Sequence, residues 1–207
     1  MAGWLVERAR VAITAMRLWC ARRIWDKPAI VAGTTHVIID MQERFLQDIL
    51  DRDRTVAAAI ENIEEAKRQG DAIVLLQYRS NKNPAGPVDP KVLAHLDGYT
   101  RCFTYDKWID NGAPEVEQAL LEHDLANQVF RLYGLNADAC VLRTGLGLRT
   151  RFPRSRVEVI KDACSSYNKH VMWPAYHWHQ RRQIWLGYYV WPGAWRIRLV
   201  RNRGRQA

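Results

Sequence analysis

The sequence lacks any apolar run of about eighteen residues or more, the length that a membrane-spanning helix requires. We therefore expect no transmembrane segment. It also lacks regular cysteine spacing: its four cysteines form no CxxC pair and no zinc-ligand cluster with histidines. This usage predicts free thiols in a reducing compartment, the cytoplasm, and not a disulfide framework.

Acidic residues are missing from one part of the chain. Residues 165–207 contain eight Lys/Arg and five of the nine tryptophans, but no Asp or Glu. Residues 1–34 are also basic, whereas residues 35–164 hold more acidic than basic side chains. The formal net charge of +9 therefore comes from the two ends, and it does not indicate binding of nucleic acid or membrane by the middle part.

We expect three parts on this basis. Residues 1–34 form a basic N-terminal extension, and residues 35–164 form the main folded body. Residues 165–207 form a divergent, basic, Trp-rich segment that completes or flanks the same domain. Whether this tail binds an anionic partner is left open by its composition.

Short apolar runs alternate with amphipathic stretches along the middle part. Strands are predicted at 35–40, 72–76, 99–105, 127–133 and 156–160, and helices at 54–69, 91–96, 114–122 and 140–150. Weaker patterns indicate a helix before Trp25, a helix at 172–184, and strands at 185–190 and 196–200. The alternation predicts an α/β fold: a five- or six-stranded parallel sheet between two layers of helices, as a three-layer α/β/α structure.

Three chemically different side chains follow three of these strands. Asp40 ends the run THVIID, Lys107 ends RCFTYDK, and Cys140 lies in LYGLNADACV, where Gly134 is expected to end the fourth strand. The carboxyl ends of parallel strands share one edge, where open α/β folds bind ligands. A thiol in the first turn of a helix and near a lysine favours the thiolate, which attacks carbonyls. A buried core cysteine and a solvated lysine are the alternative interpretations.

Several segments together resemble the isochorismatase-like cysteine hydrolases, which include nicotinamidases and N-carbamoylsarcosine amidases. The resemblance is carried by VIIDMQERF, the Lys107 segment, GLNADACVLRTGLGLR and VEVIKDA. The resemblance covers residues 35–165. Within them the acid, the base and the thiol follow one another in the same order as in the family. It implies the isochorismatase-like hydrolase fold, which is Rossmann-like.

The resemblance also implies a mechanism. Asp40, Lys107 and Cys140 would form a catalytic triad that cleaves the C–N bond of a small amide or carbamoyl substrate through an acyl-enzyme. The backbone N–H groups of Asn136 and Cys140 would form the oxyanion hole, next to a cis peptide bond between Leu135 and Asn136.

Four residues are expected to contact the substrate. Gln42 and Phe45 match family positions that wall the pocket, and Leu135 borders the nucleophile turn. Arg79 follows the second strand, where its guanidinium is placed either to bind a substrate carboxylate or to lie on the surface.

No metal and no cofactor are expected. In the metal-binding branch of the family, an aspartate and two histidines follow the second strand. Asp89 and His95 are the only candidates here, and their spacing does not match.

Two other functions stay open. The tail and the segment Asn111–Gly112–Ala113, which lacks an aromatic that is common in the family, favour a catalytically degenerate member that acts as a binding or assembly module. An isochorismatase-type vinyl ether hydrolase is possible on the same scaffold. Family members often form dimers or tetramers, so a homo-oligomer is expected.

Overall fold

The computed structural model describes residues 29–49, 51–81, 85–167, 173 and 197–201. The helix expected before Trp25 and the strand expected at 185–190 lie outside these residues, and so does the helix expected at 172–184, apart from residue 173. The described elements form one six-stranded parallel sheet with the strand order β3-β2-β1-β4-β5-β6.

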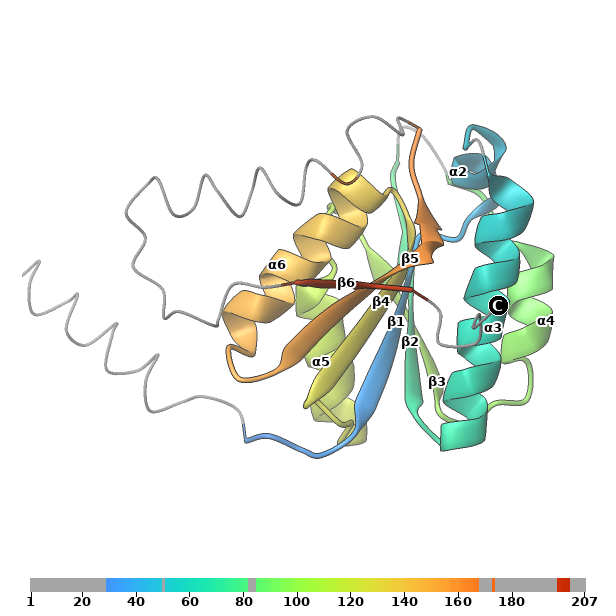
Figure 1. Cartoon of the computed structure of the whole chain (residues 1–207). Coiled ribbons are helices and arrows are strands. Elements are labelled where there is room, and N and C mark those ends of the chain that lie inside the picture. The colour runs from blue at the N-terminus through green and yellow to red at the C-terminus, as the bar shows by residue number, and fades with distance from the viewer. Residues whose placement is uncertain (1–28, 50, 82–84, 168–172, 174–196, 202–207) are drawn as a thin grey trace, which may run out of the picture.

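The elements follow one another in a βα alternation. In chain order they are β1 (Thr34–Ile39), α2 (Glu43–Gln47), α3 (Arg52–Gln69), β2 (Ala72–Tyr78), α4 (Pro90–Leu96), β3 (Cys102–Lys107), α5 (Ala113–His123), β4 (Val129–Leu135), the π-helical turn η1 (Ala137–Val141), α6 (Leu142–Arg151), β5 (Arg156–Ser165) and β6 (Arg198–Val200). Helices α2, α3 and α4 cover one face of the sheet, and α5 and α6 cover the other (Figure 1). The predicted three-layer α/β/α fold is confirmed.

The central strand β1 sets the position of the site. Its residues Val37, Ile38 and Ile39 are fully buried, as expected for a strand covered on both faces. It pairs in parallel with β2 on one side and with β4 on the other. The chain therefore reverses its direction of travel across the sheet between β1 and β4, and open α/β sheets bind ligands at such a switch point.

The main helix α3 follows the predicted apolar pattern. Val56, Ala59, Ile63 and Ala66 are buried against the sheet. Gly70 ends the helix with φ 69°, a left-handed conformation in which glycine carries no Cβ penalty.

Gly134 does not end β4, contrary to expectation; the strand runs through it to Leu135. Its φ is 128°, and a Cβ at this position would lie 2.0 Å from the carbonyl oxygen of Ile39. The register with β5 also shifts between Leu132 and Gly134. The glycine therefore allows β4 to approach the end of β1 without leaving the sheet.

The C-terminal part of the chain contributes to the sheet. Strand β5 extends to Ser165, five residues further than predicted, because it continues past the register shift. Strand β6 pairs with it in parallel, with Val159 opposite Leu199. No helix within the described ranges is long and apolar enough to cross a membrane.

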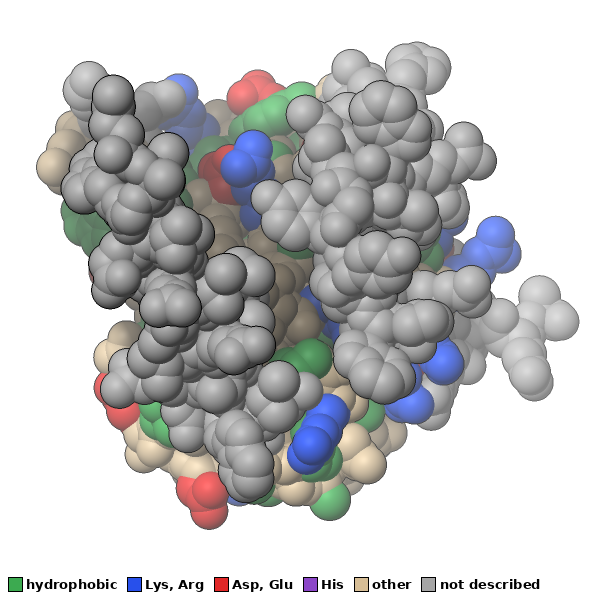
Figure 2. Space-filling model, turned by 90° about the vertical axis from the view of Figure 1, so that its left-hand side faces the viewer, with side chains coloured by type: hydrophobic (Ala, Val, Ile, Leu, Met, Phe, Trp, Pro, Cys, Tyr) green, Lys and Arg blue, Asp and Glu red, His purple; other side chains and the backbone are tan. Residues whose placement is uncertain are grey.

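The outer surface on the side of α5 and α6 carries described side chains of both charge signs. Figure 2 shows Lys and Arg beside Asp and Glu there, with hydrophobic side chains between them. The described side chains visible on this side therefore carry charges of both signs.

Candidate functional site

Asp40 comes directly after β1 and is fully buried. Its φ is 53°, a left-handed conformation that is uncommon for a residue with a side chain. The backbone N–H of Asp40 donates to the carbonyl oxygen of Leu76 at 3.1 Å, which holds this conformation against the end of β2. Such backbone strain is often found at functional positions.

Lys107 ends β3 and is also fully buried. Its Nζ lies 2.8 Å from Oδ2 of Asp40 and donates to the carbonyl oxygen of Ile109 at 3.2 Å. The same ammonium lies 4.8 Å from the ring centroid of Tyr78, at the end of β2. The charge is thus compensated by a carboxylate, a carbonyl and an aromatic face, which a buried lysine requires.

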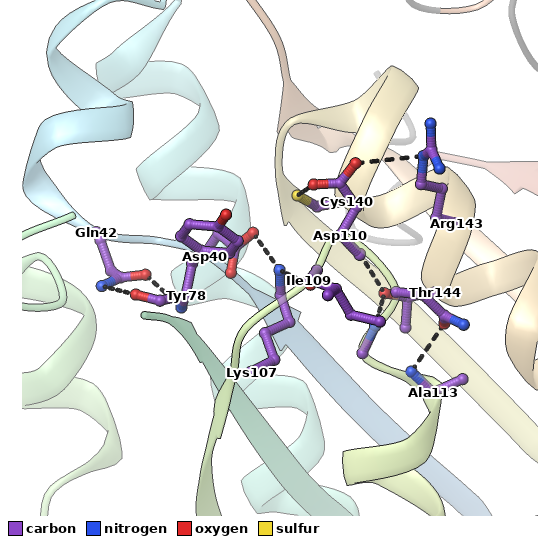
Figure 3. Close-up of polar contacts among 12 residues, drawn as sticks. Asp40, Gln42, Tyr78, Lys107, Ile109, Asp110, Ala113, Cys140, Arg143 and Thr144 are labelled. Atoms are coloured by element: carbon purple, nitrogen blue, oxygen red, sulfur yellow. Dashed lines mark hydrogen bonds and ion pairs between the residues drawn. The ribbon is translucent and has the colours of Figure 1, made fainter. Parts of the chain in front are cut away.

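Cys140 lies in η1, between β4 and α6, and only 4% of its surface is exposed. Its thiol donates to Oδ1 of Asp110 at 3.8 Å, and the buried carboxylate of Asp40 is close enough to act on the thiol electrostatically. Figure 3 shows the sulfur directed toward the Asp110 carboxylate, with the Asp40–Lys107 pair on the neighbouring strand ends. The structure therefore brings the three predicted residues to one edge of the sheet.

Burial is the largest influence on the pKa of the Cys140 thiol and of the Asp40 carboxyl. Burial raises the pKa of the Cys140 thiol well above its usual value, the charge of Asp40 raises it further, and Lys107 lowers it only in part. Lys107 therefore favours the thiolate, as expected, but burial and the charge of Asp40 outweigh it and keep the thiol protonated. Burial also raises the pKa of the Asp40 carboxyl, although Lys107 acts in the opposite direction.

The turn between β4 and α6 that carries Cys140 differs from expectation in its backbone. No peptide bond among the described residues is cis, so the bond between Leu135 and Asn136 is trans. A cis bond before a residue other than proline costs about 3 kcal/mol and needs surrounding contacts to hold it. Leu135 itself is fully buried in the core.

Gln42 is buried, and its amide bridges two segments. Its Nε2 donates to the carbonyl oxygens of Tyr78 and Gly86 at 3.2 and 2.8 Å, and its Oε1 accepts from the Tyr78 N–H at 2.7 Å. Phe45 packs edge-on against the Tyr78 ring, with centroids 5.9 Å apart. Gln42 and Phe45 therefore both hold Tyr78 in place. The sequence pattern did not identify Tyr78 as a site residue.

Arg79 lies at the carboxyl end of β2, as predicted. Its Nε pairs with Oδ1 of Asp106 at 2.9 Å, and both side chains are nearly half exposed. In the unliganded structure the guanidinium thus forms a surface ion pair, the alternative that the sequence left open.

Asp110 and Thr144 are site residues that sequence reasoning missed. The Thr144 hydroxyl on α6 accepts from the Gly112 N–H at 2.9 Å and lies 3.4 Å from the Asp110 carbonyl oxygen. The loop that follows Lys107 is therefore attached to the helix that follows Cys140. An acid three residues after Lys107 was the available signal.

Tyr167 and the Asn136 side chain were also missed. Burial raises the pKa of the Tyr167 hydroxyl, the Asn136 side chain and the Cys140 thiol both act on that pKa, and 46% of Tyr167 is exposed. The Oδ1 atom of Asn136 is buried and has no hydrogen-bond partner among the described residues. A buried acceptor without a partner, in the turn that carries Cys140, is a candidate for contact with a ligand.

Within the described ranges, no three His, Cys, Asp or Glu residues are arranged to hold a metal ion. The two candidates from the sequence have structural partners. Asp89 caps α4 and pairs with Arg52 at 3.0 Å, and His95 lies 2.9 Å from Glu64.

Comparison with known proteins places this arrangement in context. The family model described as the isochorismatase domain matches residues 34–178. None of the curated proteins matches the sequence of the chain.

Three solved structures illustrate the similarity of fold. The MAR1 ribonuclease from Caenorhabditis elegans is 21% identical, with a TM-score of 0.60 and 80% of each chain covered. The nicotinamidase/pyrazinamidase PncA from Bacillus subtilis is 14% identical, with a TM-score of 0.63, covering 82% of this chain and all of that one. YcaC from Pseudomonas aeruginosa, solved with covalent acrylamide, is 16% identical, with a TM-score of 0.62 and coverage of 81% and 75%.

Proposed function

The chain belongs to the isochorismatase domain family, and from this premise we propose that it cleaves the C–N bond of a small amide or carbamoyl compound. One observation carries the proposal: a thiol, a buried carboxylate and a buried ammonium converge at the carboxyl edge of the sheet. Acyl transfer through cysteine uses a thiol beside a general base, and the ammonium adds a positive charge next to that base.

The reaction begins from a neutral thiol. Asp40 accepts the proton of Cys140 as Sγ attacks the substrate carbonyl, and the resulting tetrahedral species collapses when Asp40 returns this proton to the leaving amine. The acyl-enzyme remains on Sγ. Asp40 then removes a proton from water, which attacks the acyl carbon, and the thiol regains its proton as the acid leaves.

Lys107 acts on this reaction through charge. A carboxylate without water is costly, and the ammonium at 2.8 Å keeps Asp40 able to act as a base. Its positive charge also favours the negative charge that develops on sulfur during attack.

The amino end of η1 supplies the electrophilic assistance. Backbone N–H groups in the first turn of a helix lack intrahelical acceptors and point toward its amino end. In the proposed reaction those of Asn136 and Cys140 donate to the oxyanion, and each such donor contributes about 3 kcal/mol to the transition state.

The Asn136 side chain favours an amide over a vinyl ether. Its buried Oδ1 lacks a partner among the described residues and accepts hydrogen bonds only. A carboxamide or carbamoyl group brings N–H donors to such an atom, whereas a vinyl ether brings none.

Replacing Cys140 by Ala tests the proposal. We expect turnover on a panel of small amides to be lost, because no nucleophile remains, with little change in melting temperature. Cys102→Ala is the matched control, since this half-buried thiol begins β3 at the end opposite Lys107. Turnover that survives in Cys140→Ala would exclude the mechanism.

The burial of the Cys140 thiol favours one alternative, a catalytically degenerate member that serves as a binding module. Acrylamide separates the two functions, because an inert thiol forms no covalent adduct in the intact protein. The small-molecule substrate, the homo-oligomer and the cytoplasmic location stay predictions from the sequence.

A further inference from the structure

Asp110 is a second carboxylate at the nucleophile. It lies in the loop between β3 and α5, and its Oδ1 accepts from the Cys140 thiol at 3.8 Å. Its Oδ2 lies 3.3 Å from Nε of Arg143 on α6, the helix that continues from the nucleophile turn. One side chain therefore touches both the sulfur and a cation on the next turn of the same helical segment (Figure 3).

The two carboxylates at the sulfur have different surroundings. Asp40 is fully buried and pairs with the buried Lys107. The Asp110 side chain is 44% exposed and pairs with an arginine that is 64% exposed. The thiol has a single proton to donate, so two acceptors of the same charge compete for it, one without water and one in contact with solvent.

We propose that Asp110 is a positioning residue for the nucleophile: with Arg143, it sets how firmly Cys140 holds its proton before a substrate binds. The proposal rests on Cys140 being the nucleophile of the proposed function. Asp110 keeps the thiol protonated through its negative charge and directs the S–H toward itself. Arg143 weakens both effects, because it neutralises the carboxylate and holds its other oxygen.

The charges around the sulfur give the sign of the effect. The ionisable groups that act on Cys140 among the described residues are Asp40, Lys107 and Asp110, with the Tyr167 hydroxyl at the rim. Asp40 and Asp110 oppose the thiolate, and Lys107 favours it. Removing the charge of Asp110 therefore makes the thiolate easier to form, and removing Arg143 makes it harder.

The rate of Cys140 alkylation by iodoacetamide, followed against pH by peptide mass spectrometry of the full chain, tests this directly. A nearby charge shifts a pKa by about one unit, so Asp110→Asn increases the thiolate fraction about tenfold below the pKa. Because nucleophilicity falls as the pKa falls, the net gain in rate at a given pH is about threefold. Arg143→Gln shifts the profile in the opposite direction.

The double variant shows whether Arg143 acts through Asp110. In Asp110→Asn/Arg143→Gln the arginine has no carboxylate to neutralise, so the profile matches that of Asp110→Asn alone. An Arg143 effect that persists at full size in the background of the Asp110→Asn substitution would overturn the proposed linkage.

A matched control comes from the neighbouring surface pair. Arg79→Gln and Asp106→Asn break an exposed Arg–Asp contact of 2.9 Å that does not touch the sulfur, so neither should move the profile. Asp110→Glu keeps the charge and should move it less than Asp110→Asn.

Two results would overturn the proposal. One is an unchanged profile in folded Asp110→Asn. The other, which applies even if that variant fails to fold, is an unchanged profile in Arg143→Gln, a substitution at an exposed position. Neither result needs a substrate. Loss of turnover in Cys140→Ala with unchanged profiles would leave the hydrolase standing and remove the role of Asp110.

Discussion

Two carboxylates in this structure are each paired with a cation at a similar distance, but their pKa values shift in opposite directions. Asp40 lies 2.8 Å from Lys107 at the carboxyl edge of the sheet, and Glu65 on α3 lies 3.0 Å from Arg131 in β4. Asp40 is fully buried, whereas 20% of the Glu65 side chain is exposed. Burial raises the pKa of Asp40; at Glu65 burial also acts upward, but the hydrogen bond and charge of Arg131 lower the net pKa.

The contrast indicates which buried charges mark a site. Arg131 pairs with two acids from different elements: besides Glu65, it lies 3.5 Å from Glu158 of β5, which Arg156 also contacts. This cluster joins α3 to the sheet and is locally balanced. The Asp40–Lys107 pair lies beside a thiol and a second acid, so its charges act on the Cys140 sulfur, the nucleophile of the proposed function.

The largest effect is expected from Lys107→Met, which removes the only cation paired with a fully buried carboxylate in the described part of the chain. An uncompensated buried charge costs about 3–5 kcal/mol, so the free energy of unfolding should fall by that amount at neutral pH. Urea unfolding measures this loss.

The Asp40→Asn/Lys107→Met double variant is the control for this change. It removes both charges and should recover most of the stability, though not the turnover. A double variant as unstable as Lys107→Met would show that packing, and not charge, accounts for the loss.

A smaller effect is expected from Arg131→Met. Glu158 keeps Arg156 as a partner and Glu65 keeps access to water, so the loss in unfolding free energy should be about 1–3 kcal/mol. The rate of Cys140 alkylation should not change, because Arg131 lies within the strand and away from the carboxyl edge. An altered alkylation rate would mean that the two regions are coupled.

The smallest effect is a difference in pH dependence. Glu65 has a lowered pKa in the folded state, so its stabilisation is present above its ordinary value of 4.5 and is lost as the pH falls through the folded value. Asp40 has a raised pKa, so its stabilisation is complete below its ordinary value of 3.8 and is lost as the pH rises through the folded value.

The free energy of unfolding, measured at several pH values between neutral and acidic, can separate the two pH dependences. Relative to Glu65→Gln, the native chain should lose stability in acid. Relative to Asp40→Asn, it should gain stability in acid. Slopes of the same sign would contradict the opposite roles of burial at the two pairs.

Much of the fold and of the site was predictable from the sequence. Consecutive apolar residues such as Val37 to Ile39 indicate a strand buried on both faces, and parallel strands share one carboxyl edge. Asp40 and Cys140 follow β1 and β4, and Lys107 ends the edge strand β3, so the parallel topology brings all three to the carboxyl edge.

The rest depends on packing that a pattern does not contain. Asp110 reaches the sulfur because Thr144 attaches its loop to α6, a contact between residues 34 positions apart. The raised pKa of Cys140 results from burial, which outweighs the helix and the lysine that local reasoning considered. Strand β5 ends beyond a shift in its register with β4, so the pattern of apolar and polar residues along the sequence could not locate its end.

Gly134 has a consequence for mutational tolerance. A side chain there would overlap the backbone next to Asp40, so selection for the proposed activity would act on this glycine as well as on Cys140. One position is constrained by backbone space and the other by chemistry. Residue frequencies among active variants would not distinguish the two positions. A stability measurement would, because a substitution at Gly134 should destabilise the fold, whereas Cys140→Ala should remove the proposed activity alone.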